Sequence, residues 1–220
     1  MRWRSKDRAP QYRFVAVLIG TLTVLVFQIA APDTTAGRVV TLGLQGLTLA
    51  TVIITSGVPG GLRMLARLGI FLILAAIVVG VVTGDFDRAL TGAAGAAFSL
   101  AALPAVGYGV VTMMRTSGVS IQVVSGALTA YLLAGLLFAS VIGILAAGAS
   151  NGYFEGGQEG TTSDHVYFSF TTLTTTGYGD LAPATRPGRS IAVVEMLLGQ
   201  LYLVTVVGVL VANLASPRRE

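Results

Sequence analysis

Seven consecutive residues near the C-terminus could bind a dehydrated cation through their backbone: Thr174, Thr175, Thr176, Gly177, Tyr178, Gly179 and Asp180. Such an ion needs oxygen ligands on all sides, and a strand whose successive carbonyls point toward one axis supplies them. Gly177 and Gly179 have no Cβ, so they reach positive φ angles at little cost. The expected ion ligands are Thr175, Thr176, Gly177, Tyr178 and Gly179, and Thr175 adds its hydroxyl at the inner mouth.

The residues on either side of this segment make the pattern specific. We expect a short aromatic-rich helix over 163–174, an ion-binding filter over 175–179, and a turn that contains Pro183. This run resembles the pore region of the potassium-channel family. The resemblance is specific over about residues 125–214. It implies permeant K⁺ at Thr175, Thr176, Gly177 and Tyr178, and no organic cofactor.

Thr176 departs from the family pattern, in which Val or Ile is most frequent at this position. The family binds the ion there through the backbone carbonyl, so we expect selectivity to survive the difference. How firmly the filter packs against its helix is left open.

The composition is typical of a membrane protein, with 54% hydrophobic and 11% charged residues. A spanning helix needs about 20 mostly apolar residues. We therefore predict an all-α membrane protein with six transmembrane helices, at 14–31, 38–56, 64–83, 89–113, 121–148 and 189–214. The segment between the fifth and sixth is too polar to cross, so we predict a re-entrant pore helix and selectivity filter there.

The charges are distributed unevenly between the ends of these predicted spans. With the N-terminus in the cytoplasm, ten of the 14 basic residues lie inside: Arg2, Arg4, Lys6, Arg8, Arg13, Arg63, Arg67, Arg115, Arg218 and Arg219. Outside lie Arg38, Arg88, Arg186 and Arg189, with seven acids, Asp33, Asp85, Asp87, Glu155, Glu159, Asp164 and Asp180. Basic residues in short loops favour the cytoplasmic face. We expect a plasma-membrane protein with both termini cytoplasmic, which contacts anionic membrane lipids and binds no nucleic acid.

Three regions follow from this layout: a cytoplasmic segment (1–13), a four-helix bundle (14–115) and a pore domain (116–220). The pore domain has its outer helix at 121–148 and its inner helix at 189–214. A voltage sensor needs several charges that move through the membrane field. Between Arg88 and Arg115 the fourth helix has no charged residue, so we expect a channel that is not gated by an arginine voltage sensor.

Several side chains are candidates for supporting the filter or opening the pore. Glu195 is the one carboxylate within a predicted span, and the hydroxyls of Ser169, Thr171 or Thr172 are its expected partners. In the family an aromatic donor holds the aspartate after the filter, so Tyr167 or Tyr178 is expected to bind Asp180.

Two glycines of the inner helix are candidates for opening the pore. Gly199 lies at the position of the family's gating hinge, and both Gly199 and Gly208 suit either bending or close packing. His165, the only histidine, could sense external pH or simply begin the pore helix.

A single filter strand cannot surround an ion, so the expected assembly is a homotetramer. Transporters of the potassium-uptake type carry four pore repeats in one polypeptide, whereas this sequence has one. The Gly-x-Ser-Gly motif of rhomboid-type proteases is missing and no Walker-type loop lies within the spans, so no enzyme is expected. A weakly selective cation channel and a non-conducting or accessory channel subunit remain as alternatives.

Overall fold

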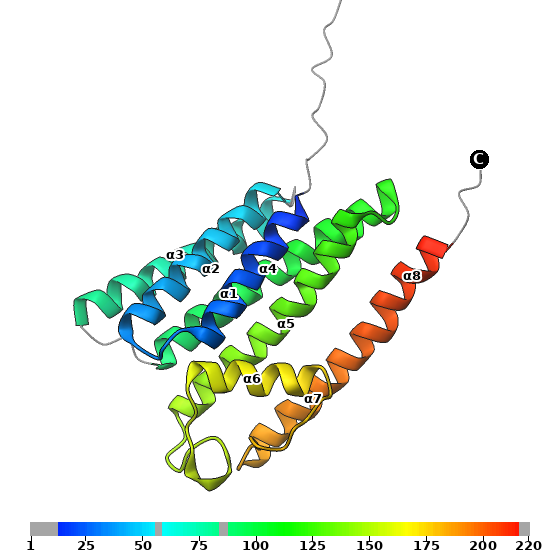
Figure 1. The fold of residues 1–220 in the computed structure, drawn as a ribbon. Coiled ribbons are helices and arrows are strands. Elements are labelled where there is room, and N and C mark those ends of the chain that lie inside the picture. Colours follow the sequence, from blue (N-terminus) through cyan, green and yellow to red (C-terminus); the bar gives the residue numbers. More distant parts are fainter. Residues whose placement is uncertain (1–12, 56–58, 84–87, 216–220) are drawn as a thin grey trace, which may run out of the picture.

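The computed structural model describes residues 13–55, 59–83 and 88–215, where the regular elements are helices and the only pairing is two isolated β-bridges at Phe154. The helices are α1 (Phe14–Ala30), α2 (Thr35–Thr55), α3 (Gly60–Thr83), α4 (Arg88–Ser117), α5 (Ile121–Ala147), α6 (Thr162–Leu173), α7 (Arg186–Tyr202) and α8 (Gly208–Ala215). A short 3₁₀ turn, η1 (Glu155–Gly157), precedes α6, and a π-helical segment, η2 (Leu203–Val207), joins α7 to α8. In Figure 1, α1 to α4 form a bundle beside α5, and α6 crosses between α5 and α7.

Within the described residues, five helical stretches are long and apolar enough to cross a membrane: Thr35–Thr55, Gly60–Thr83, Ala89–Ser117, Ile121–Ala147 and Arg186–Leu210. They overlap the last five spans predicted from the sequence. The apolar helix α1 is shorter, with 17 residues. At 1.5 Å per residue it is about 26 Å long, somewhat less than the hydrocarbon thickness. The chain is therefore an all-helical protein with several helices able to span a membrane.

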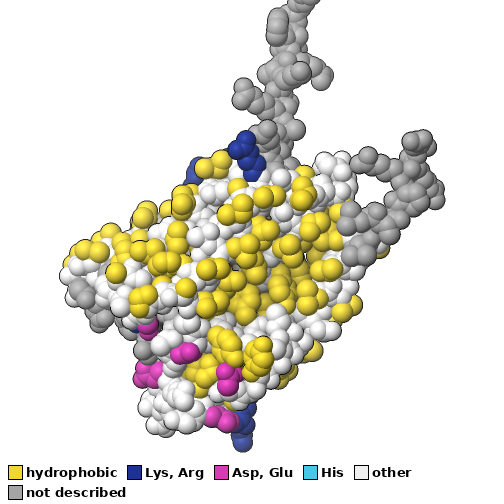
Figure 2. All heavy atoms as spheres, in the orientation of Figure 1, with side chains coloured by type: hydrophobic (Ala, Val, Ile, Leu, Met, Phe, Trp, Pro, Cys, Tyr) yellow, Lys and Arg dark blue, Asp and Glu magenta, His cyan; other side chains and the backbone are white. Residues whose placement is uncertain are grey.

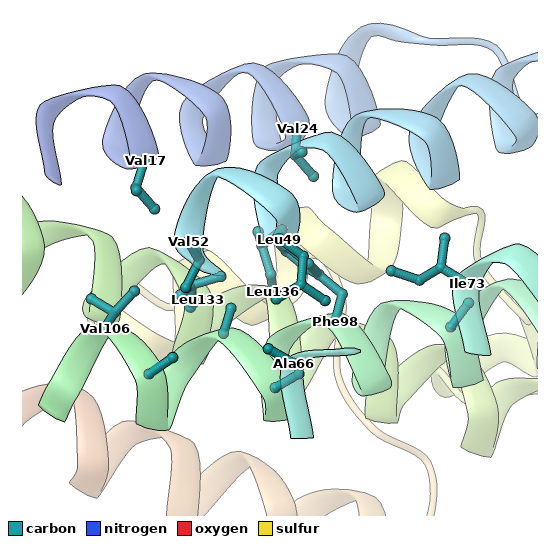
Figure 3. Close-up of a cluster of buried hydrophobic side chains, with 14 of the residues drawn as sticks. Val17, Val24, Leu49, Val52, Ala66, Ile73, Phe98, Val106, Leu133 and Leu136 are labelled. Atoms are coloured by element: carbon teal, nitrogen blue, oxygen red, sulfur yellow. The ribbon is translucent and has the colours of Figure 1, made fainter. Parts of the chain in front are cut away.

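The bundle of α1 to α4 packs against α5 of its own chain. Figure 3 shows side chains of α1, α2, α3, α4 and α5 meeting in one buried cluster that includes Val24, Leu49, Ile73, Phe98 and Leu136. The connection between α4 and α5 is a short turn, in which Gly118 has a φ of 70°. Ser120 then caps α5 by accepting a hydrogen bond from the Val123 N–H. Because this turn is short, α4 folds back along α5.

Glycines allow the close approach of these helices. A Cβ added at Gly95 on α4 would lie 2.5 Å from the Ser140 hydroxyl oxygen on α5. A Cβ at Gly126 on α5 would overlap Val110 and lie 3.1 Å from the ring of Phe14. Gly126 therefore sits where α1, α4 and α5 converge.

The surface separates into an apolar middle and charged ends (Figure 2). Hydrophobic side chains cover most of the visible face, and acidic side chains gather at the end that carries α6. Near the opposite end of the bundle lie Arg13, Arg63, Arg67 and Arg115, at the helix ends there. This distribution agrees with the charge asymmetry of the sequence, although the segment 1–12 and the tail 216–220 lie outside the described residues.

Replacing Gly126 by Ala should destabilise the protein, because the new methyl group would collide with Val110 and Phe14. Overpacking of this kind costs about 1–3 kcal/mol. The matched control is Gly107→Ala on α4, where no described atom beyond the local helix backbone lies within 4 Å of the added Cβ. Thermal unfolding in detergent should show a lower midpoint for G126A only. Equal midpoints for the two variants would contradict the packing at this crossing.

Candidate functional site

The candidate site begins with α6, whose start is fixed by its own sequence. Thr161 accepts a hydrogen bond from the Asp164 N–H, and the Asp164 carboxylate accepts one from the Thr161 N–H at 2.7 Å. This reciprocal capping box satisfies backbone donors that the first turn of a helix leaves free. The helix spans Thr162–Leu173, within one residue of the range expected from the sequence. Its C-terminal end therefore lies directly before the predicted filter.

The backbone of the predicted filter alternates in handedness. Thr175, Gly177 and Gly179 have φ angles of 58°, 54° and 81°, whereas no positive φ occurs at Thr176 or Tyr178. In an ordinary strand successive carbonyls point in opposite directions, and alternating the sign of φ turns them toward the same side. This is the arrangement that a row of cation ligands requires. The sequence predicted the two glycines, but not the positive φ of Thr175.

Hydrogen bonds tie the start of this segment to the end of α6. The N–H groups of Thr176 and Gly177 both donate to the Thr171 carbonyl oxygen, at 2.8 and 3.1 Å. The Thr175 N–H donates to the Thr172 carbonyl at 2.9 Å. Thr171 and Thr172 thus contact the filter through their backbones, so their side chains are not needed for this contact. Side chains meet as well, since the Thr174 and Thr176 hydroxyl oxygens lie 2.9 Å apart.

The far end of the filter is held by Tyr167 and Asp180. The Tyr167 hydroxyl donates to the Asp180 carboxylate at 2.9 Å, which is the pairing expected for one of the two candidate tyrosines. The ring of Tyr167 also stacks on that of Tyr178, with centroids 6.2 Å apart and planes 3° from parallel. The hydrogen bond to Asp180 raises the pKa of Tyr167, so the phenol keeps its proton at neutral pH. One α6 side chain therefore contacts both Tyr178 and the residue that follows the filter.

Glu195 lies behind α6 and is fully buried. Of the three candidate hydroxyls, Ser169 is its partner, with 2.5 Å between Ser169 Oγ and Glu195 Oε1. Ser169 Oγ also lies 2.7 Å from the Gly135 carbonyl oxygen on α5. These contacts join α5, α6 and α7 at one point. Whether they support the filter in function stays a prediction.

The loop before α6 encloses this region from the outside. The Tyr153 carbonyl accepts a hydrogen bond from the Ala184 N–H at 2.9 Å, and Glu155 forms an ion pair with Arg189 at 2.9 Å. The Tyr153 side chain is 2% exposed. Burial first, and the nearby Glu195 second, raise the pKa of Tyr153 to about 12. The Tyr153 hydroxyl therefore keeps its proton across the physiological pH range.

His165 also belongs to this enclosed region. It is buried, its Nε2 lies 2.9 Å from the Glu159 carbonyl oxygen, and its ring contacts that of Phe154 at 6.0 Å between centroids. The suggestion that it senses external pH stays a prediction.

The two candidate hinge glycines have different surroundings. A Cβ at Gly199 would overlap the Leu173 carbonyl oxygen at the end of α6, whereas nothing described lies within 4 Å of a Cβ at Gly208. Gly199 lies within the regular helix α7, and the irregular segment η2 (Leu203–Val207) lies between the two glycines. Close packing accounts for Gly199. The role of either glycine as a hinge stays a prediction.

Two tyrosines that the sequence analysis did not single out connect the same helices. The Tyr131 hydroxyl on α5 donates to the Leu173 carbonyl at 3.2 Å, and the Tyr202 hydroxyl on α7 donates to the Ala127 carbonyl at 2.6 Å. Their rings lie 5.5 Å apart. A half-buried tyrosine in an apolar span needs a partner for its hydroxyl, so the presence of tyrosine there was the available signal.

Comparison with known proteins gives two matches, one of which lies on this part of the chain. Residues 129–216, which contain α6, the filter segment and α7, match the family model described as "Ion channel". An 81-residue stretch is 34% identical to a Rhodopseudomonas palustris protein named "Putative potassium channel protein". The match covers 37% of this chain and spans 19% of the length of that relative. These findings indicate an ion-channel domain. Domains of the ion-channel class imply a protein that is not an enzyme. They support a potassium-channel family.

Replacing Tyr167 by Phe should loosen the outer end of the filter, because Asp180 loses the donor at 2.9 Å. We expect the ratio of K⁺ to Na⁺ flux to fall several-fold in proteoliposomes. Tyr108→Phe on α4 is the control, since the structure shows no hydrogen bond from that hydroxyl. An unchanged flux ratio in Y167F would argue against this brace.

Replacing Gly199 by Ala should disturb the contact between α7 and α6, at a cost of about 1–3 kcal/mol from overpacking. Gly208→Ala has free space and replaces a helical glycine, so it should gain up to about 1 kcal/mol. Thermal unfolding and ion flux of the two variants check this. A tolerated G199A together with a G208A that abolishes flux would instead locate the critical flexibility at Gly208.

Proposed function

We propose that the protein is a potassium-selective channel that conducts K⁺ passively across the plasma membrane. The observation that supports it best is the alternation of positive φ at Thr175, Gly177 and Gly179, because it turns a row of carbonyl oxygens toward one side. Those oxygens would replace the hydration shell of K⁺, with ions bound at Thr175, Thr176, Gly177 and Tyr178. K⁺ is thus the cargo, and no organic cofactor is proposed.

A homotetramer is part of this proposal. Residues 174–180 are all exposed in the single chain, and nothing described lies within 4 Å of a Cβ at Gly177 or Gly179. The inner helix also exposes large apolar side chains, namely Val193, Val194, Leu197, Leu198, Leu201 and Val204. Four copies around an axis would surround the ion with carbonyls. They would also cover this apolar surface.

The membrane arrangement is proposed on the charge pattern. Six transmembrane helices, α1 included, would place Arg13, Arg63, Arg67 and Arg115 in the cytoplasm with both termini, in contact with lipid head groups. The filter would open to the outside beside the acidic end of the molecule (Figure 2). We propose the same three regions as the sequence predicts: a segment 1–13, a bundle 14–115 and a pore domain 116–220. The fourth helix has no charge between Arg88 and Arg115, so an arginine voltage sensor is not proposed.

Reconstitution of the purified protein into liposomes with a K⁺ gradient tests the proposal. We expect K⁺ flux that barium blocks, rejection of Na⁺, and fourfold stoichiometry of the particle. The control is Gly179→Ala, because alanine reaches a φ of 81° only at a cost, so flux should fall while assembly is checked separately. Equal passage of Na⁺ and K⁺ would favour a weakly selective cation channel. Tetramers without flux would favour an accessory subunit.

A further inference from the structure

The two short contacts of the Ser169 hydroxyl restrict where protons can lie between Ser169, Glu195 and Gly135. Ser169 Oγ lies 2.5 Å from Glu195 Oε1 and 2.7 Å from the Gly135 carbonyl oxygen. A serine hydroxyl has one proton and two acceptor lone pairs. A carbonyl oxygen accepts only, and an ionised carboxylate also accepts only. If Glu195 were ionised, one proton would have to serve two acceptors, and one of the two short contacts would have no hydrogen in it.

A proton on Glu195 removes this conflict. The carboxylic acid then donates to Ser169 Oγ, and Ser169 donates its own proton to the Gly135 carbonyl. Each short oxygen contact contains one hydrogen, and the chain of donors runs from α7 through α6 to α5. The distances fit ordinary O–H···O hydrogen bonds.

The surroundings of Glu195 also disfavour a charge. Its side chain is 0% exposed, and within the described part of the chain it forms no ion pair. The titratable side chains near it are Tyr131 on α5 and Tyr153 in the loop before α6, which are both neutral when protonated. A buried carboxylate without a counter-charge is costly, and more so at membrane depth. The neutral acid avoids this cost.

The remaining oxygen of Glu195 has a complementary neighbour. Glu195 Oε2 and the Tyr153 hydroxyl are both buried without a hydrogen-bond partner among the described residues. The phenol keeps its proton because burial alone disfavours its ionisation, so it is a donor. Oε2 of a carboxylic acid is a carbonyl oxygen and therefore an acceptor. The two groups match in role, and Glu195 is close enough to act electrostatically on Tyr153. Because no direct hydrogen bond joins the two atoms, one bridging water would connect them.

We propose that Glu195 is held as a neutral carboxylic acid that donates to Ser169 and accepts from Tyr153 through one water. It is a positioning residue, since it acts on the filter through α6 and touches no ion. Its importance for conduction rests on the proposed function, whereas its protonation does not. Hydrogen bonds that involve Glu195 and Ser169 would then connect the loop before α6 with α5, α6 and α7.

Infrared spectroscopy of the full-length protein at neutral pH tests the protonation. A protonated carboxyl has a C=O stretch that is separate from the carboxylate bands and shifts when H₂O is replaced by D₂O. We expect this band in the unaltered protein and its loss in Glu195→Gln. The matched control is Glu159→Gln, which removes an exposed carboxylate and should keep the band. No such band in the unaltered protein, or its survival in E195Q, would overturn the proposal.

Two further variants test whether Ser169 and Tyr153 are the hydrogen-bond partners of Glu195. The readout is the frequency of the carboxyl band, which a purely structural role in packing would leave unchanged. Ser169→Ala removes the acceptor of the acid proton, and Tyr153→Phe removes the donor to Oε2 while keeping the ring. Each should shift the carboxyl band in a protein that still assembles. An unshifted band in Y153F would remove Tyr153 from the arrangement, and an unshifted band in S169A would overturn it.

Flux measurements separate this inference from the proposed function. Glu195→Gln keeps one donor and one acceptor and should retain K⁺ selectivity, whereas Glu195→Leu keeps neither and should lose it. If E195Q behaved like E195L, the neutral-acid role would be wrong although the channel conducts. If the unaltered protein showed the carboxyl band without any K⁺ flux, the proposed function would fail and the protonation would stand.

Discussion

The proposed function depends on one constraint, which is that four or five consecutive peptide groups must present their oxygens to the same side. Side-chain chemistry cannot enforce this, because a relaxed strand points alternate carbonyls in opposite directions. The alternation of φ at Thr175, Gly177 and Gly179 fits this constraint, and hydrogen bonds to the Thr171 and Thr172 carbonyls anchor the start of the segment. A threonine in the left-handed region costs about 1–2 kcal/mol, which those bonds must offset.

The remaining elements act on this segment through α6. The capping box at Thr161 and Asp164 fixes where the helix starts, and Tyr167 on its outer side holds Asp180. Behind it, the hydroxyls of Ser169 and Tyr131 connect α6 to α5 and α7, while Gly199 allows the α7 backbone to approach Leu173. Small residues on α4 and α5 then bring the bundle against α5. The bundle and α6 are therefore joined by continuous packing through α5.

Much of this arrangement was predictable because the relevant signals are local. Apolar stretches near 20 residues gave the boundaries of the long helices to within a few residues, and the Gly-x-Gly spacing predicted positive φ at two positions. The partner of Glu195 was narrowed to three hydroxyls, because a carboxyl inside a span needs a polar neighbour. The choice of Ser169 was not predictable, since it depends on how α7 is rotated about its axis relative to α6. The contacts of Tyr131 and Tyr202 were missed because their partners lie 42 and 75 residues away in the chain. Tyr153 was missed because it lies in a loop, where no periodic pattern indicates burial.

The amino-acid sequence by itself determined the helical membrane-protein composition, the order of the elements and the segment able to present backbone oxygens. These properties depend on hydrophobicity and on steric limits at single residues, so they can be predicted from short stretches of the sequence. Only the tertiary structure decided that the bundle packs on α5 of its own chain and that Ser169 lies between Glu195 and the Gly135 carbonyl. It also placed Thr175 in the left-handed region. Such features arise from contacts between residues far apart in the chain, or from hydrogen bonds that outweigh a local preference, and no single stretch of sequence contains them.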